Sequence, residues 1–336
     1  MAADADLGLD SPQGERESVR RLLRLLATSG AALMFIVIVA SAYMRLSQAG
    51  LSCADWPACY GRADAHAAAA AGMGGARIVH RIAASAVGIV LLAALLVGIA
   101  QHPRPKRQVA LIVAALVIAL FLAGLGSAIP ASTAALPSLR VTLANLGGGF
   151  ALLALLWWLR LSTLQAALPE KQAPSLKLVA ALALLAVIAQ IALGALVSAK
   201  FAALACPAFP GCGADSPQGA LLESFDLTRD PSFGANGEML RPDSLAALHW
   251  AHRAGALVSV ALGAAVALWL LRAGGHARRI GFVVIVLLVA QLSLGAAAVL
   301  ANFPLALVVA HNACAALLLL ALISANRVLY VGVRKE

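Results

Sequence analysis

The chain has 336 residues, of which 62% are hydrophobic and only 12% are charged, whereas an ordinary soluble domain has about 25% charged residues. A mean hydropathy of +0.91 excludes a soluble enzyme or a disordered chain, because too little polar surface exists to cover the apolar side chains. The net charge of +10 does not indicate nucleic-acid binding, because the basic residues occur in short groups typical of span flanks. We predict an integral membrane protein in a lipid bilayer, with no nucleic-acid partner.

Eight apolar runs are long enough for membrane spans, since one span needs about 20 apolar residues. Each run should be a helix, because a segment in lipid must satisfy its own backbone hydrogen bonds, and the sequence lacks the short alternating segments of a membrane barrel. No signal-peptide cleavage pattern is present, so the first span should be retained as an anchor. The expected spans are 30–46, 78–100, 108–129, 139–161, 176–198, 246–271, 279–301 and 304–326.

The distribution of Lys and Arg predicts the orientation of the spans. Basic residues gather in the N-terminal tail, after the second, fourth and sixth spans, and at the C-terminus. By the positive-inside rule, both termini lie in the cytoplasm of a bacterial-type inner membrane. The two long loops, near 47–77 and 199–245, then face outward.

The chain repeats itself at about half its length. Segments 53–59 and 206–212 both read Cys-x5-Cys with an internal proline, and each follows a span. His80 and His252 each precede an arginine at the start of the next span. The sequence therefore predicts two repeated four-helix bundles of the same orientation.

This repeat predicts the domain boundaries. A further echo, outside the half-length register, links Gln190-Ile-Ala-Leu-Gly194 in the fifth span to Gln291-Leu-Ser-Leu-Gly295 in the seventh. The expected units are a cytoplasmic polar tail (1–29), an N-terminal four-helix half (30–165), a cytoplasmic linker (166–175) and a C-terminal four-helix half (176–330).

Intramembrane histidines are the first functional candidates, because polar side chains at bilayer depth are costly. His252 in the sixth span and His311 in the eighth lie about two turns from their outward ends, roughly 10 Å below the interface at about 1.5 Å per residue. Two imidazoles at one depth on adjacent helices can supply both axial ligands of a haem iron. The alternative is a pair of interfacial histidines bonded to loop carbonyls. A bare metal centre is disfavoured, since no carboxylate or thiol partner lies at that depth.

The cysteines form two outward pairs without the CxxC spacing of metal sites. An oxidising compartment favours disulfides, Cys53 with Cys59 and Cys206 with Cys212, which would hold each loop against its bundle. A redox couple is the alternative. Cys314 should be a small buried apolar residue.

Four segments spread over nearly the whole chain carry a recognisable pattern: Arg45-Leu-Ser-Gln-Ala-Gly-Leu-Ser-Cys-Ala-Asp-Trp-Pro-Ala-Cys59, 193–206, His249-Trp-Ala-His-Arg253 and 304–318. In this order, they resemble the haem A synthase family. The resemblance implies an all-α, eight-span protein with two halves. It implies that haem b lies between His252 and His311 in the C-terminal half. It further implies that the N-terminal half binds haem O and oxidises its C8 methyl, by successive hydroxylations, to the formyl of haem A.

The same resemblance implies functional partners. Haem O synthase would supply the substrate, and a terminal cytochrome oxidase would receive haem A. A homo-oligomer is compatible with these features.

Two positions depart from the family's pattern. Arg77 stands where a glutamate usually precedes the first histidine of the N-terminal half, and Asn145 stands in place of that half's second histidine. Asparagine is a poor iron ligand, and a guanidinium cannot accept a proton. Three interpretations remain open. In the first, haem binds through His80 alone. In the second, a loop residue such as His66 or Met73 completes the site. In the third, the half is no longer catalytic, the protein carries haem, and Arg77 pairs with a haem propionate.

These observations favour a haem A synthase-type oxidoreductase. The alternative is a catalytically altered haem-binding or oxidase-assembly protein of the same fold. Glycines 147–149 remove side-chain bulk, so we expect a macrocycle pocket beside His80, between the second and fourth spans; a filled pocket is the other outcome. A transporter is disfavoured, since no Asp or Glu lies within the eight runs.

Overall fold

The computed structural model describes residues 12–51, 53, 59–60, 73–128, 138–164, 174–212, 221–228 and 243–331. Within these ranges the chain forms eight long helices and two short ones, with no strand. Each long helix has the length and apolar composition needed to cross a membrane. The predicted all-α, multi-span membrane fold is therefore confirmed.

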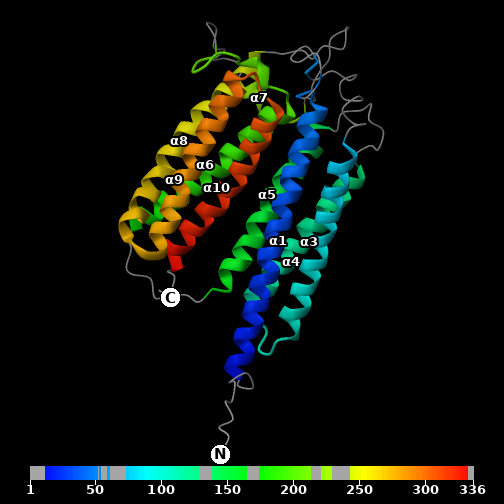
Figure 1. Cartoon of the computed structure of the whole chain (residues 1–336), viewed down its shortest axis with the longest axis vertical. Helices are drawn as coiled ribbons and strands as arrows, with labels where there is room; N and C mark the ends of the chain where they lie inside the picture. Colours follow the sequence, from blue (N-terminus) through cyan, green and yellow to red (C-terminus); the bar gives the residue numbers. More distant parts are fainter. Residues whose placement is uncertain are drawn as a thin grey trace, which may run out of the picture.

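The long helices form two groups of four that lie side by side (Figure 1). The first group comprises α1 (Pro12–Gln48), α3 (Gly74–Ala100), α4 (Lys106–Ala128) and α5 (Leu139–Ser162). The second group comprises α6 (Pro174–Ala199), α8 (Asp243–Ala273), α9 (Gly275–Leu300) and α10 (Leu305–Val331). Two short helices, η1 (Ala203–Ala205) and α7 (Leu221–Ser224), lie between α6 and α8 along the chain.

Each group is a ring of four helices. In the first group, α1 and α4 each pack against α3 and α5; in the second, α6 and α9 each pack against α8 and α10. Helices α8 and α10 are therefore diagonal neighbours that face each other across the interior. The groups meet where α10 packs against α1 and α5, and where α5 packs against α6. This shared order accords with an internal duplication, which stays a prediction.

Helix α1 begins much earlier than the apolar run at residue 30, within the segment that we expected to be a polar tail. Leu23 and Ala27 are each only 1% exposed and belong to the core of the first group, whereas Arg20 and Arg21 are exposed. An apolar stripe on an otherwise polar helix continues the packing beyond the apolar run. Hydropathy alone misses such an extension. The other span edges agree closely with the predictions.

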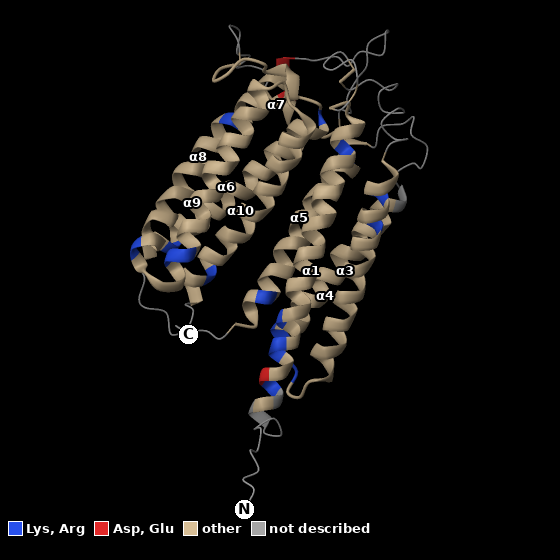
Figure 2. Cartoon of the chain, viewed as in Figure 1, with Lys and Arg blue, Asp and Glu red and all other residues tan. Residues whose placement is uncertain are grey.

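Basic side chains gather at the ends of the helices that lie away from the cysteine loops (Figure 2). Two of them stabilise the C-terminal end of α5. Arg24 donates to the carbonyl of Thr163. Arg327, which is buried, donates to the carbonyls of Leu161 and Leu164. Guanidinium groups there complement the partial negative charge of the helix terminus.

Candidate functional site

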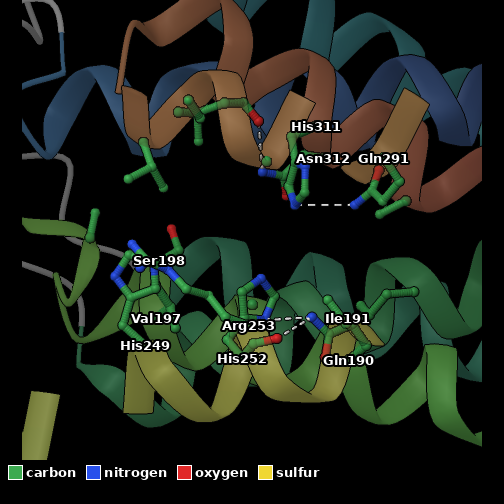
Figure 3. A pocket seen from close by; sticks show the side chains of 18 of the residues that line it. Gln190, Ile191, Val197, Ser198, His249, His252, Arg253, Gln291, His311 and Asn312 are labelled. Carbon is green, nitrogen blue, oxygen red and sulfur yellow. Dashed lines mark hydrogen bonds between the residues drawn. The ribbon is translucent and has the colours of Figure 1, made fainter. Parts of the chain in front are cut away.

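Two imidazoles face each other inside the second group of helices. His252 on α8 and His311 on α10 have ring centres 6.4 Å apart and ring planes at 73° (Figure 3). Because α8 and α10 are diagonal in the ring, these side chains approach from opposite sides of its interior. The structure thus brings together the two histidines that the sequence predicted as a pair.

A cavity of about 570 Å³ lies beside the pair, within the range of about 300–1,000 Å³ of ligand pockets. All four helices of the second group line it, and the helices of the first group contribute Arg45, Leu46, Leu146 and Phe150. Its described lining residues include three histidines and two arginines but no Asp or Glu. The cavity is therefore apolar with an unbalanced positive charge.

Gln190 on α6 holds the imidazole of His252. Its amide nitrogen donates to the backbone carbonyl of His252 over 2.7 Å and lies 3.1 Å from Nδ1 of the same residue. An amide nitrogen carries two hydrogens, so it can serve both acceptors and fix the ring orientation. Nε2 of His252 then remains for a ligand.

Gln291 on α9 holds the other imidazole in a similar way. Its amide nitrogen lies 3.1 Å from Nε2 of His311. Nδ1 of His311 is buried without a hydrogen-bond partner among the described residues, as are the amide oxygens of Gln190 and Gln291. Buried polar atoms without partners are costly, so these atoms are consistent with a site built around a further polar group or metal.

Two glycines allow the helices to approach the imidazoles. A Cβ added at Gly194 would lie 3.0 Å from Cε1 of His252, and one added at Gly295 would lie 3.2 Å from Cε1 of His311. Both glycines follow their glutamine by four residues, one turn along the same helix face. Each copy of the repeated Gln-x-x-x-Gly pattern therefore positions one histidine: the glutamine contacts the imidazole, and the glycine leaves room for it.

The spacing of the rings suits a single metal atom. Metal–imidazole nitrogen bonds are about 2 Å long, so two imidazoles on opposite sides of one metal have ring centres about 6 Å apart. His252 and His311 could therefore hold a haem iron in the cavity. Within the described residues, no group of three or more His, Cys, Asp and Glu side chains could hold a bare metal ion.

Neighbouring polar residues secure the loop next to the cavity. Arg253 donates through Nη1 to the carbonyls of Ala208 and Gly211 and through Nη2 to that of Cys206, each over 2.6 Å. The buried His249 has Nδ1 3.1 Å from the carbonyl of Ala202. These residues fix the polypeptide that follows α6, and His249 is a structural histidine.

Comparison with known proteins agrees with the resemblance in the sequence. The chain matches the COX15-CtaA family, described as cytochrome oxidase assembly protein, over residues 24–72 and 76–323. The chain belongs to this family. A curated relative, the heme A synthase of Shewanella oneidensis, is 31% identical over an alignment of 315 residues, and the match covers 88% of this chain and 93% of the relative.

The COX15-CtaA match includes three residues that we singled out in the N-terminal half, His80, Arg77 and Asn145, and the structure places them outside the cavity. His80 and Arg77 are half-buried on α3, and Asn145 is half-buried on α5; none of them lines the cavity. His66 lies outside the described residues, and Met73 is buried at the start of α3. The structure therefore does not join these residues to the histidine pair.

The expected space beside the glycine run of α5 is largely taken by side chains. A Cβ at Gly148 would lie 2.7 Å from Cδ2 of Leu122, and one at Gly149 would lie 3.5 Å from Cε of Met34. Only Gly147 has no atom within 4 Å of such a Cβ. At Gly148 and Gly149, the absence of a side chain allows close packing against α4 and α1. These two glycines therefore do not open space for a macrocycle, and the pocket beside His80, between α3 and α5, stays a prediction.

The cysteines lie where the sequence predicted disulfides. The structure pairs Cys53 with Cys59 and Cys206 with Cys212, with Cα atoms 6.6 Å and 4.6 Å apart. Gly50 has φ +99°, and a Cβ there would lie 2.9 Å from the carbonyl oxygen of Cys59, so the turn after α1 requires glycine.

The fifth cysteine, Cys314, is free and buried.

Sequence reasoning missed three residues of the site. Gln190 and Gln291 were visible as a repeated pattern but were not connected to the histidines. Arg45 lay in the segment that carries the family resemblance, yet its place at the cavity of the other group was not expected. The available signal was a single arginine close to the end of a long apolar run.

Proposed function

We propose that the chain is a haem A synthase-type membrane oxidoreductase. It would oxidise the C8 methyl of haem O, by successive hydroxylations, to the formyl of haem A. The observation that supports this best is the pair of imidazoles, 6.4 Å apart, beside a large apolar cavity. Membership of the COX15-CtaA family and the similarity to a heme A synthase point to the same activity.

In this proposal haem b is the resident cofactor of the C-terminal half (176–330), with His252 and His311 as its axial ligands. The unpartnered Nδ1 of His311 and the size of the cavity fit such a group. Haem b held by both imidazoles would supply one-electron transfer. Gln190 and Gln291 orient the imidazoles, and the apolar lining excludes water from them.

The N-terminal half (30–165) would bind the substrate haem, with His80 as its protein ligand. Asn145 leaves the second axial position without a strong ligand, and an open position suits oxygen chemistry. Arg77 is one turn before His80 on the same helix face and would pair with a propionate.

A second candidate function has its own support. Leu122 and Met34 pack against Gly148 and Gly149, where a macrocycle would otherwise approach α5. With Arg77 and Asn145 at the altered positions, this packing favours a catalytically altered haem-binding or oxidase-assembly protein. Such a protein would keep the haem b of the C-terminal half and would not convert haem O.

The proposal includes the cellular setting. Both termini and the linker (166–175) would be cytoplasmic in a bacterial-type inner membrane, because basic residues dominate that side. The cysteine loops would then face an oxidising compartment, which favours the disulfides Cys53–Cys59 and Cys206–Cys212. Haem O synthase would supply the substrate and cytochrome oxidase would receive the product.

Identification of the bound haems tests this proposal. The full chain is purified in detergent from cells that make haem O, and its extracted haems are separated and identified by mass spectrometry. We expect haem b together with haem O or haem A. Haem b alone, from cells that contain haem O, would favour the second candidate; a preparation without any haem would contradict both.

A further inference from the structure

Arg45 belongs to the first group of helices but lines the cavity of the second. It lies one turn before the end of α1, and its Nε donates to Oγ of Ser198 on α6 over 3.1 Å. This hydrogen bond joins the two groups and orients the guanidinium towards the cavity that it lines. The cavity of the C-terminal half is therefore completed by a residue of the N-terminal half.

The charge of the cavity has no counterion among the described residues. Arg253, the other arginine of the lining, gives its terminal nitrogens to the carbonyls of Cys206, Ala208 and Gly211. The terminal nitrogens of Arg45 differ, because only its Nε has a hydrogen-bond acceptor among the described residues. An unpaired guanidinium in an apolar site is costly, so an anionic group of the occupant is expected to lie there.

The terminal nitrogens of Arg45 suit a carboxylate. With Nε engaged by Ser198, the guanidinium still offers the edge formed by Nη1 and Nη2, which can donate two parallel hydrogen bonds to a carboxylate. Arg45 is three residues from the end of α1, whereas His311 is six residues from the start of α10. Arg45 therefore lies about one turn nearer the end of its helix than His311 does.

We infer that Arg45 binds a carboxylate of the group held between His252 and His311. This inference rests on the proposed function, in which that group is a haem and the carboxylate is one of its propionates. Arg45 thereby selects for a macrocycle that carries an acid and fixes its rotation about the axis through the imidazoles. It also makes the haem site of one half depend on the other half.

Haem b and its dimethyl ester test this directly, because the ester keeps the iron and the ring but lacks both carboxylates. The full-length protein is depleted of haem in detergent and titrated with each compound, followed by absorbance. We expect the wild type to bind haem b about tenfold or more tightly than the ester, as a charge-assisted hydrogen bond implies. Arg45→Gln should lose most of this preference by weakening haem b alone, and Arg45→Lys should retain part of it.

Arg140→Gln is the matched control, because Arg140 is an exposed arginine at the start of α5 that does not line the cavity. It should bind both compounds as the wild type does. At saturating haem b, Arg45→Gln should still give the bis-imidazole spectrum, which shows that the variant is folded and its histidines are in place. A variant that keeps the full preference, or that loses both compounds equally, overturns this inference alone. A wild type that binds neither compound overturns the proposed function, and this inference with it.

Discussion

The two groups of helices share a neighbour order but differ in what fills them. The buried residues of the first group form an apolar core, in which Leu91, Leu153 and Ile112 have no exposed surface. The second group also has an apolar core, but beside it lie facing imidazoles, two glutamines and a cavity of about 570 Å³. The arrangement of four helices alone therefore does not create a binding site. The side chains that point into the interior decide whether a cavity remains.

A single register shows how the difference arises. When Cys53 is aligned with Cys206, Gln190 of α6 aligns with Val37 of α1. Gln190 holds His252 and leaves space, whereas Val37 is buried in the apolar core. On α4, the ring counterpart of α9, Leu122 packs against α5. In the first group, the apolar side chains of Val37 and Leu122 pack tightly. In the second group, the amides of Gln190 and Gln291 hold the imidazoles.

The largest expected effect comes from removing either imidazole of the second group. His252→Ala and His311→Ala should each abolish the bis-imidazole absorbance of the purified protein, because each leaves the iron with one protein ligand. His80→Ala, in the first group, should leave that absorbance unchanged. If both cavity variants kept the wild-type spectrum, the assignment of the site to the second group would be wrong.

The second-largest effect is expected from Gln190 and Gln291, which hold the imidazoles of the second group of helices. Gln190→Leu and Gln291→Leu should each weaken haem b binding about tenfold to a hundredfold, as expected when a hydrogen bond to a ligating histidine is lost. Titration of the depleted protein measures this loss. The reduction potential should also shift, because the amide sets the basicity of the imidazole. If both variants kept the wild-type affinity for haem b and the wild-type reduction potential, the two glutamines would contribute packing alone.

The fold was predictable because its signal is distributed over long stretches. Eight apolar runs each specify a helix in lipid, and an error of a few residues at either end changes nothing in the arrangement. The exception was α1, where Leu23 and Ala27 continue the core beneath an arginine-rich surface. A stripe of this kind has helical periodicity but low mean hydropathy, so a search for apolar runs places the start of the helix too late.

The candidate site was only partly predictable, because local sequence patterns do not show which residues of distant helices lie close together. His252 and His311 could be paired from their matched depth. The contact of Arg45 with Ser198 depends on how the two groups dock, and no spacing in the sequence reports it. The glycines of α5 have the same limit: a missing side chain permits either a ligand or a neighbouring helix, and at Gly148 the structure places Leu122 of α4 there.

Restoring the family's residues in the first group would sharpen the comparison by gain of function. Asn145→His should convert a substrate haem bound by His80 towards six-coordination, seen as a change in its absorbance. Adding Arg77→Glu should raise haem A production about tenfold, because a carboxylate can accept a proton and a guanidinium cannot. A double variant with unaltered haem content and no more haem A would favour the carrier function.

The smallest expected effect tests how closely the helices approach the imidazoles. Gly295→Ala places a Cβ 3.2 Å from Cε1 of His311, closer than an unstrained contact, so the ring must tilt. The absorbance and potential of the bound haem should shift slightly while the haem is retained. Gly147→Ala in the first group is the matched control, because its Cβ would meet nothing within 4 Å. Alanine there should leave the spectrum alone and stabilise the helix by up to about 1 kcal/mol, as thermal unfolding would show. Equal spectra for the two variants would mean that α9 does not hold His311 as tightly as the structure indicates.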